Sequence, residues 1–223
     1  MKGKFWVIEG LDGCGKTTQM ECLKEALEKR NIPYKYIHFP MLNKGVYGEL
    51  VAEFLRGEYG TVEGVHPKLV ALLFANDRME HIATINGWLD EGYHVIADRY
   101  VYSNIAYQCA KLNDQNQAAD LREWIFNTEY GDFELPRPDL NIFLDVPIAF
   151  VESKLKSQRG GADRDYLEGA QDIHEADIEF QKRVRDIYRE QCLKDPKFIR
   201  IDCSDDNGCM LPPDTIFEKI REV

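Results

Sequence analysis

The chain has 223 residues, of which 44% are apolar and 30% charged, which is enough to bury one sizeable core and favours a single domain over residues 1–223. Its 39 acidic and 28 basic residues leave a net charge of −11, which argues against nucleic acid as a partner. The cysteines form no C-x-x-C pair, the histidines have no ligand-like spacing, and no run approaches the ~20 apolar residues of a membrane span. These features argue against structural zinc and a disulfide framework, so we expect a soluble cytoplasmic protein with no membrane partner.

Short apolar runs alternate with longer helical periods along the chain, which is the pattern of β-α-β units. The short runs predict strands at residues 5–8, 36–39, 94–97, 141–144 and 198–201. Helical spacing places two apolar sets each on one helix face, namely Leu72, Ala75, Met79, Ile82, Ile85 and Leu89, and later Ile173, Ala176, Phe180, Val184 and Ile187. The expected fold class is α/β, with a five-stranded parallel sheet that carries helices on both faces.

A glycine-rich motif, Gly10-Leu11-Asp12-Gly13-Cys14-Gly15-Lys16-Thr17, follows the first strand and fits the pattern G-x-x-x-x-G-K-[ST]. Its glycines let backbone amides turn onto phosphate oxygens, and the following helix adds a partial positive charge. Lys16 would bridge the β- and γ-phosphates, and the Thr17 hydroxyl would hold Mg²⁺. We therefore expect ATP and Mg²⁺ as ligands and a three-layer sandwich of the P-loop nucleoside-triphosphate-hydrolase type. The residues expected to bind the nucleotide are Gly10, Asp12, Gly13, Cys14, Gly15, Lys16, Thr17 and Thr18.

Asp98 and Arg99 follow the third strand, at the edge where open parallel sheets bind ligands. In isolation such a pair is more often a helix cap or a surface ion pair. A P-loop enzyme, however, needs an Asp on a neighbouring strand end for Mg²⁺ and a basic group to offset charge during transfer. We therefore expect Asp98 to bind the metal with Thr17, and Arg99 to be catalytic.

The segment from Ser157 to Arg164 joins two helical periods and combines paired glycines with charged residues, without apolar anchors. This composition predicts a mobile surface loop.

Further motifs follow the P-loop in a recognisable order. They are FP at 39–40, LFANDR at 73–78, DRY at 98–100, SNIAYQ at 103–108, PDL at 138–140, FLD at 143–145 and the Arg-containing loop at 159–164. Together with EGLDGCGKTTQ at 9–19, they resemble the thymidylate kinase family of nucleoside monophosphate kinases over nearly the whole chain, from Phe5 to about Ile220. The resemblance implies phosphoryl transfer from MgATP to dTMP, giving dTDP and ADP for dTTP synthesis, by a homodimer.

The resemblance also implies an acceptor pocket. Phe74 and Arg78 are four residues apart, hence on one helix face, and would stack on the thymine ring and donate to its carbonyl. Asp12 would accept a hydrogen bond from the sugar 3′-hydroxyl. The remaining substrate-binding residues implied, which line the base pocket, the 2′ side of the sugar and the phosphate end, are Phe39, Arg99, Ser103, Asn104, Tyr107 and Gln108.

The chain departs from the family pattern at two places. Many relatives have a basic residue soon after the Phe-Pro pair, whereas here the next cation is Lys44. Some relatives also carry an arginine after the P-loop carboxylate, where this chain has Gly13. The resemblance is then to the branch whose lid loop, here about 157–168, supplies the catalytic cation, and the candidates are Arg159 and Arg164.

Two other functions compete with this one. The first is a kinase for another pyrimidine nucleotide or a deoxynucleoside, which Arg78, Asn104 and Arg99 make less favourable. The second is a nucleotide-sensing module without turnover, which would be expected to have lost Lys16, Asp98 or the lid arginines.

Overall fold

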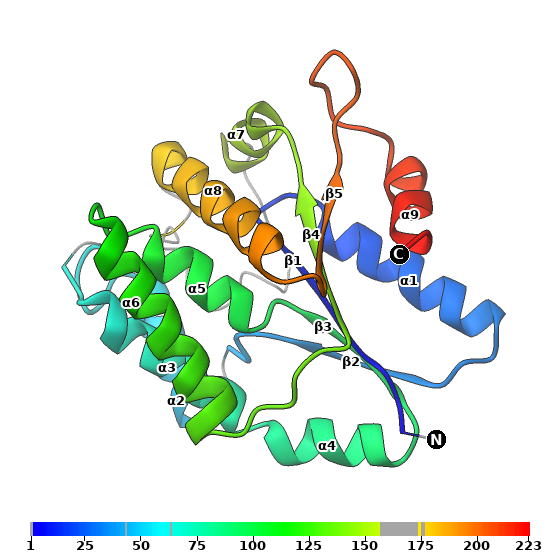
Figure 1. Ribbon diagram of the computed structural model, residues 1–223, viewed down its shortest axis with the longest axis horizontal. Helices are drawn as coiled ribbons and strands as arrows, with labels where there is room; N and C mark the ends of the chain where they lie inside the picture. Colours follow the sequence, from blue (N-terminus) through cyan, green and yellow to red (C-terminus); the bar gives the residue numbers. More distant parts are fainter. Residues whose placement is uncertain (1, 43, 63, 157–173, 175–176) are drawn as a thin grey trace.

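A parallel β-sheet forms the centre of the computed structural model, which describes residues 2–223 apart from 43, 63, 157–173, 175 and 176 (Figure 1). In this part of the chain the strand order is β2-β3-β1-β4-β5. The strands are β1 (Phe5–Gly10), β2 (Tyr34–His38), β3 (His94–Asp98), β4 (Leu140–Asp145) and β5 (Phe198–Asp202). The predicted five-stranded parallel sheet is confirmed, with strand ends shifted by at most two residues.

Helices cover both faces of the sheet. They are α1 (Lys16–Lys29), α2 (Gly45–Leu55), α3 (Pro67–Met79), α4 (Ile82–Asp90), α5 (Val101–Cys109), α6 (Gln115–Phe126), α7 (Ile148–Lys156), α8 (Ile178–Lys194) and α9 (Pro213–Arg221), and a π-helical turn, η1 (Asn127–Asp132), follows α6. In Figure 1, α1 and α9 lie together on one side of the sheet, whereas α5 and α8 lie on the other. Helices α2, α3 and α6 form an outer layer beyond α5.

The register of the central strands places the functional motifs at one edge. Ile8 of β1 pairs with Asp98 of β3, and Gly10 of β1 pairs with Leu144 of β4. The P-loop and the turn after Asp98 therefore leave the sheet side by side, at its carboxyl edge. The strands below this edge are almost wholly buried, as predicted for a sheet covered on both faces.

The apolar stripe from Leu72 to Leu89 is not one helix, and this prediction was wrong. Helix α3 ends at Met79 and α4 begins at Ile82. The amide of His81 donates to the carbonyl oxygen of Arg78 at 3.0 Å, and its ring Nδ1 lies 2.8 Å from the carbonyl oxygen of Asp77. In a continued α-helix the carbonyl oxygen of Asp77 would accept from the amide of His81. Here that oxygen contacts the His81 ring instead, and α3 ends. Leu72 lies on α3 and is exposed.

The second stripe lies on α8, where Phe180 and Val184 are buried and Ile187 is partly buried. Ile173 and Ala176 lie outside the described residues. In the described ranges, no helix combines the length and apolar character that crossing a membrane requires.

Candidate functional site

The P-loop connects β1 to α1 with backbone conformations that require glycine. Gly15, with φ of 91°, lies in the left-handed region directly before α1. A Cβ on Gly10 would lie 2.5 Å from the Cys14 sulfur. The N-terminus of α1 has no side-chain cap, so its first amides have no acceptor from the capping residue. An anion such as a phosphate fits this position.

Lys16 lies folded against the loop that precedes it. Its side chain is buried, and Nζ donates to the carbonyl oxygens of Leu11 at 3.0 Å and Gly10 at 3.3 Å. The ammonium group is therefore held at the mouth of the phosphate cradle, and in the described chain it forms no salt bridge with a carboxylate.

Asp98 occupies the end of β3, beside the P-loop. Its Oδ2 lies 3.4 Å from Nδ1 of His38, whereas its Oδ1 is buried and has no hydrogen-bond partner in the described chain. Burial by itself would raise the pKa of Asp98, but the charges of Lys16 and His38 outweigh it and hold the pKa below its usual value. The carboxylate is therefore ionised at neutral pH, with one oxygen still available.

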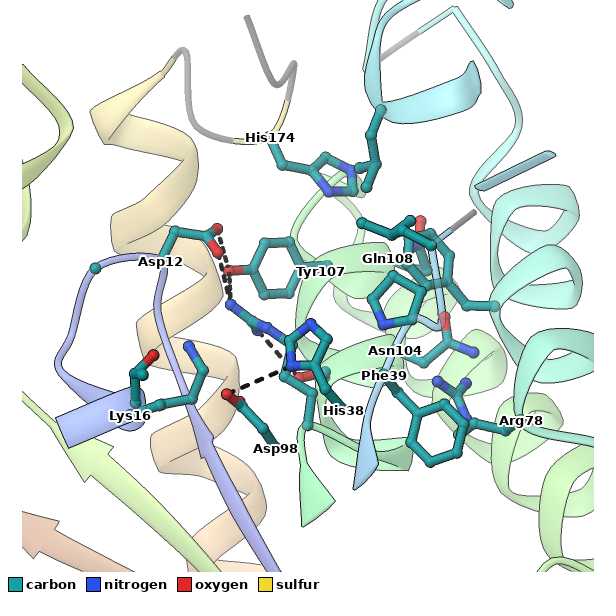
Figure 2. Close-up of a pocket in the computed structure, with 18 of the residues that line it drawn as sticks. Asp12, Lys16, His38, Phe39, Arg78, Asp98, Asn104, Tyr107, Gln108 and His174 are labelled. Atoms are coloured by element: carbon teal, nitrogen blue, oxygen red, sulfur yellow. Dashed lines mark hydrogen bonds and ion pairs between the residues drawn. The ribbon is translucent and has the colours of Figure 1, made fainter. Parts of the chain in front are cut away.

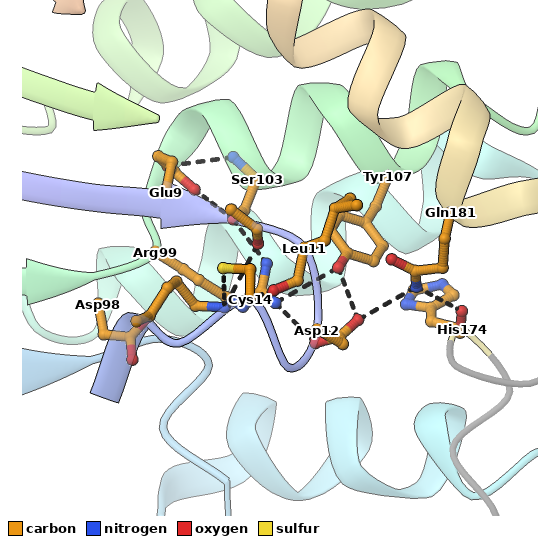
Figure 3. Close-up of polar contacts among 12 residues, drawn as sticks. Glu9, Leu11, Asp12, Cys14, Asp98, Arg99, Ser103, Tyr107, His174 and Gln181 are labelled. Atoms are coloured by element: carbon orange, nitrogen blue, oxygen red, sulfur yellow. Dashed lines mark hydrogen bonds and ion pairs between the residues drawn. The ribbon is translucent and has the colours of Figure 1, made fainter. Parts of the chain in front are cut away.

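Asp12 and Arg99 form an ion pair between the P-loop and the turn after β3 (Figure 3). Arg99 Nη2 lies 2.6 Å from Asp12 Oδ1, and the Tyr107 hydroxyl donates to Asp12 Oδ2 at 2.6 Å. Gln181 Nε2, from α8, also donates to Oδ2, at 3.3 Å. Burial would raise the pKa of Asp12, but Arg99 and Lys16 together hold it well below its ordinary value.

Arg99 has a strained backbone. Its φ of 66° lies in the left-handed region, which a residue with a Cβ rarely occupies. Such conformations occur where surrounding contacts impose them, often at functional sites. The guanidinium group of Arg99 reaches Asp12 through Nη2, and its Nη1 donates to Ser103 Oγ at 3.2 Å.

The opposite end of the site contains a buried polar cluster on α3, α5 and η1. Arg78 is 1% exposed and donates through Nε and Nη2 to the two carboxylate oxygens of Glu129, each at 2.6 Å. Asn104 Nδ2 donates to Glu129 Oε1 at 2.8 Å and to the carbonyl oxygen of Ala71 at 3.0 Å. Because both of these partners are acceptors, the amide orientation of Asn104 is fixed. Its Oδ1 is buried without a partner in the described chain, as is Oε1 of Gln108.

A cavity of about 370 Å³ joins the two ends (Figure 2). Most of the residues predicted from the sequence line it: Asp12, Gly13, Gly15, Lys16, Thr17, Thr18, Phe39, Phe74, Arg78, Asp98, Arg99, Ser103, Asn104, Tyr107 and Gln108. Gly10 and Cys14 shape the P-loop but do not line the cavity, and neither does the exposed Lys44. Arg159 and Arg164 lie outside the described residues.

Sequence reasoning missed several residues of this site, among them His174, Glu129 and Gln181. His174 lines the cavity, and its ring stacks on Phe180 with the centroids 5.6 Å apart. Burial, with the charge of Lys111, lowers the pKa of His174 well below its usual value, so the ring is neutral. Glu129 accepts hydrogen bonds from Arg78 and Asn104, and Gln181 donates one to Asp12, so both fix side chains of the site without lining the cavity. None of the three belongs to a motif or a periodic pattern, so only the fold brings them to the site.

The described residues contain no group of three or more His, Cys, Asp or Glu side chains arranged to hold a metal ion.

Known proteins are similar to this chain in sequence and in fold. A protein-family model described as Thymidylate kinase matches residues 8–210. The chain is 32% identical to a thymidylate kinase of Plasmodium falciparum over 203 residues, which cover 91% of this chain and 83% of the relative. It is 37% identical to one of Mycobacterium tuberculosis over 184 residues, which cover 82% and 83%. A solved structure of thymidylate kinase from Candida albicans superposes with a TM-score of 0.72 at 27% identity, covering 99% of this chain and 90% of that one.

The pH dependence of stability tests the ion pair of Asp12. Because its pKa is lowered on folding, the pair stabilises the fold at every pH above the unfolded value of about 4, and this stabilisation is lost as the pH falls through the lower folded pKa. Asp12→Asn should reduce the free energy of unfolding by roughly 1–3 kcal/mol at neutral pH, measured by urea denaturation. The difference from the parent should be constant between about pH 5 and 8 and shrink below about pH 4.

Asp186→Asn provides the control, since this carboxylate on α8 is 73% exposed and its replacement should change stability by less than about 0.5 kcal/mol. A gap for Asp12→Asn that opened or closed between pH 5 and 8 would contradict the ion pair.

Proposed function

The chain belongs to the thymidylate kinase family and transfers a phosphoryl group from ATP to dTMP, giving dTDP and ADP, and we propose that the cavity between the P-loop and Arg78 is where both substrates meet. One observation carries this assignment: a phosphate cradle at one end of the cavity faces unpaired polar atoms of the kind that a base would satisfy at the other.

The donor phosphates bind at the P-loop. Amides at the start of α1, preceded by Gly15, face the phosphate oxygens, and the N-terminus of the helix favours their negative charge. Lys16 exchanges its bonds to Gly10 and Leu11 for the β- and γ-phosphates. This exchange costs little free energy, because the ammonium group gives up hydrogen bonds to neutral carbonyl oxygens and gains bonds to charged phosphate oxygens.

The residues present fit Mg²⁺. Asp98 offers an ionised carboxylate with one buried oxygen that has no partner in the described chain, and Thr17 offers a hydroxyl that lines the same cavity. Oxygen ligands of this kind, completed by phosphate oxygens and water, suit this ion. When bound, Mg²⁺ would neutralise charge on the β- and γ-phosphates.

The base of dTMP binds between Phe74, Arg78 and Asn104. Glu129 accepts from Nε and Nη2 of Arg78. The remaining nitrogen, Nη1, has no acceptor in the described chain, and we assign it as the donor to a thymine carbonyl. Asn104 Oδ1, the orphaned acceptor, receives the N3–H of the ring. Cytosine lacks that hydrogen and presents an amino group in place of the carbonyl, so it meets both groups with the wrong polarity.

The sugar and the acceptor phosphate lie between these two ends. The 3′-hydroxyl donates to Asp12, and the ring of Tyr107, which is held by its hydroxyl bond to Asp12, closes the 2′ side against a ribose hydroxyl. Arg99 binds the acceptor phosphate, since its guanidinium already lies at the boundary of the P-loop and α5.

The reaction follows from this placement. An oxygen of the acceptor phosphate attacks the γ-phosphorus in line, and the bond to the oxygen that bridges the β- and γ-phosphorus atoms breaks, leaving its electrons on ADP. Lys16 and Arg99 stabilise charge on the transferring group. Because Gly13 provides no cation from the P-loop, we assign the remaining transition-state cation to Arg159 or Arg164 of the lid.

We also propose that the protein is a homodimer. Apolar side chains on the outer helices α2 and α3 are exposed, with Val46 65%, Leu69 61% and Leu72 36% accessible. Contact with a second copy would bury them. A cytoplasmic location fits the six cysteines, all of which are free.

An assay of ATP consumption with different acceptors tests the function as a whole. The chain should consume ATP with dTMP, far less with CMP, and not measurably with thymidine or without an acceptor. For CMP, each mismatched edge costs roughly 1–3 kcal/mol, so kcat/KM should fall by at least about tenfold. Comparable kcat/KM for CMP and dTMP would remove the base-pocket assignment and favour another pyrimidine nucleotide as the acceptor.

Replacement of the P-loop lysine tests the donor site. Lys16→Ala should reduce turnover to less than about a tenth of the parent rate, because the transferred phosphoryl group loses its cation. Its melting temperature should be near that of the parent. Lys29→Ala, which removes an exposed lysine from the last turn of the same helix, should leave turnover unchanged. Retention of more than about a tenth of activity in Lys16→Ala would refute the assigned charge stabilisation.

Replacement of the lid arginines tests the source of the third cation. At least one of Arg159→Ala and Arg164→Ala should lower kcat by roughly 10²–10³, the scale of removing one transition-state donor. Lys156→Ala removes an exposed cation at the end of α7, just before the lid, and should have no such effect. If both single variants and the double variant turned over dTMP within about threefold of the parent, the cation would lie elsewhere, and Lys44 would be tested next.

A further inference from the structure

Glu9 is a buried carboxylate to which the proposed mechanism assigns no role. It lies near the end of β1, directly before the P-loop, and is 0% exposed. A carboxylate in this position is destabilising unless surrounding donors satisfy its oxygens. Its partners therefore indicate why an acid stands there.

Four hydrogen bonds converge on this carboxylate. Oε1 accepts from the backbone amides of Tyr100 at 2.9 Å and Ser103 at 3.2 Å. Oε2 accepts from the Ser103 hydroxyl at 2.5 Å and the Tyr188 hydroxyl at 3.0 Å. The two hydroxyls also contact each other at 2.7 Å. Each of the two oxygens accepts two of these bonds. A carboxylate accepts through both oxygens, whereas the amide of a glutamine accepts through only one, so the four donors suit an acid at this position.

The amide bonds make Glu9 the cap of α5. Tyr100 precedes the helix at the N-cap position, and its own side chain makes no capping bond. Glu9 supplies the missing acceptor from the neighbouring strand, and its hydrogen bonds partly offset the burial that raises the pKa of its carboxyl. It thereby fixes the start of the helix that carries Ser103, Asn104 and Tyr107.

Arg99 lies between two fixed points of this network. Its backbone amide donates to the carbonyl oxygen of Ile8 at 3.0 Å, and the next amide, that of Tyr100, donates to Glu9. Its guanidinium group donates to the same Ser103 hydroxyl that donates to Glu9 (Figure 3). The left-handed backbone of Arg99 is therefore held from both sides and through its side chain.

We propose that Glu9 is a positioning residue, which acts through Ser103, Tyr188 and the start of α5 to hold Arg99 in the conformation that binds the acceptor phosphate. It contacts no substrate. This inference rests on the proposed function of Arg99. It differs from a purely structural role because loss of Glu9 or of its hydroxyl partners weakens recognition of the phosphate group in particular.

A comparison of two ligands separates these roles. dTMP and thymidine share the base and sugar, and only dTMP carries the phosphate that Arg99 binds. The ratio of their dissociation constants, measured by calorimetry, reports the contribution of the phosphate. The parent should bind dTMP at least about tenfold more tightly than thymidine, as expected for a charge-assisted hydrogen bond.

Two variants disturb the network to different degrees. Glu9→Gln replaces one acceptor oxygen by an amide nitrogen, so the Ser103 and Tyr188 hydroxyls can no longer both donate to it. Tyr188→Phe removes a single hydroxyl and keeps the buried ring, which stacks on Phe143 with the centroids 4.8 Å apart. The matched control is Tyr102→Phe, whose ring stacks on Phe198 and whose hydroxyl donates to Asp195, away from the network.

Both network variants should lower the ratio, Glu9→Gln by about tenfold and Tyr188→Phe by about threefold, with thymidine affinity unchanged, while Tyr102→Phe retains the parent ratio. Equal weakening of both ligands, or an unchanged ratio, would overturn the proposal. If Glu9→Gln does not fold, the ratio measured for Tyr188→Phe tests the proposal by itself. A parent that bound dTMP and thymidine equally would instead refute the phosphate-binding role of Arg99, and the positioning role with it.

Discussion

The ion pair between Asp12 and Arg99 joins the two halves of the site. Asp12 belongs to the P-loop, to which we assign the donor, whereas Arg99 belongs to the turn before α5, the helix that carries four of the residues assigned to the acceptor. Their contact of 2.6 Å is largely shielded from water, which strengthens it, and the strained backbone of Arg99 is adapted to it. Gln181 extends the connection to α8, because its Nε2 donates both to Asp12 and, at 2.8 Å, to the carbonyl oxygen of His174. The ion pair and the hydrogen bonds of Gln181 thus connect the proposed donor site, the proposed acceptor site and α8.

The site also reconciles an acidic chain with phosphate-bearing substrates. Although the net charge is −11, Lys16, Arg78 and Arg99 gather around one cavity. Arg78 and Arg99 are paired with carboxylates, Glu129 and Asp12, so neither is an unpaired buried charge. Both arginines line the cavity while they are paired, so a ligand in the cavity could contact either of them without rearrangement of the fold. Such preorganisation lowers the cost of binding and of charge development during transfer.

The sequence predicted the parts of this arrangement that depend on local pattern. Alternating apolar runs located the strands, and the fixed glycine and lysine spacing located the phosphate cradle, because both signals arise from a few consecutive residues. The break at His81 escaped prediction because the apolar spacing continues across it, whereas the helix ends in backbone and side-chain contacts of His81 with Arg78 and Asp77. Glu129, His174 and Gln181 escaped prediction because their roles depend on side-chain contacts with residues about 25 to 170 positions away in the chain. The residue-by-residue roles came from the family resemblance, and the geometry now gives several of them a physical basis, such as the orphaned acceptor of Asn104.

A double-mutant cycle on Asp12 and Arg99 tests the coupling of the two halves most directly. The measured quantity is kcat/KM for dTMP in the parent, Asp12→Asn, Arg99→Lys and the double variant. If the two residues act as one unit, the second substitution should add little to the first, and the coupling energy should reach about 1.5 kcal/mol or more. If the two effects added to within about 0.5 kcal/mol, the residues would act independently, and the ion pair would not be what joins the donor and acceptor sites.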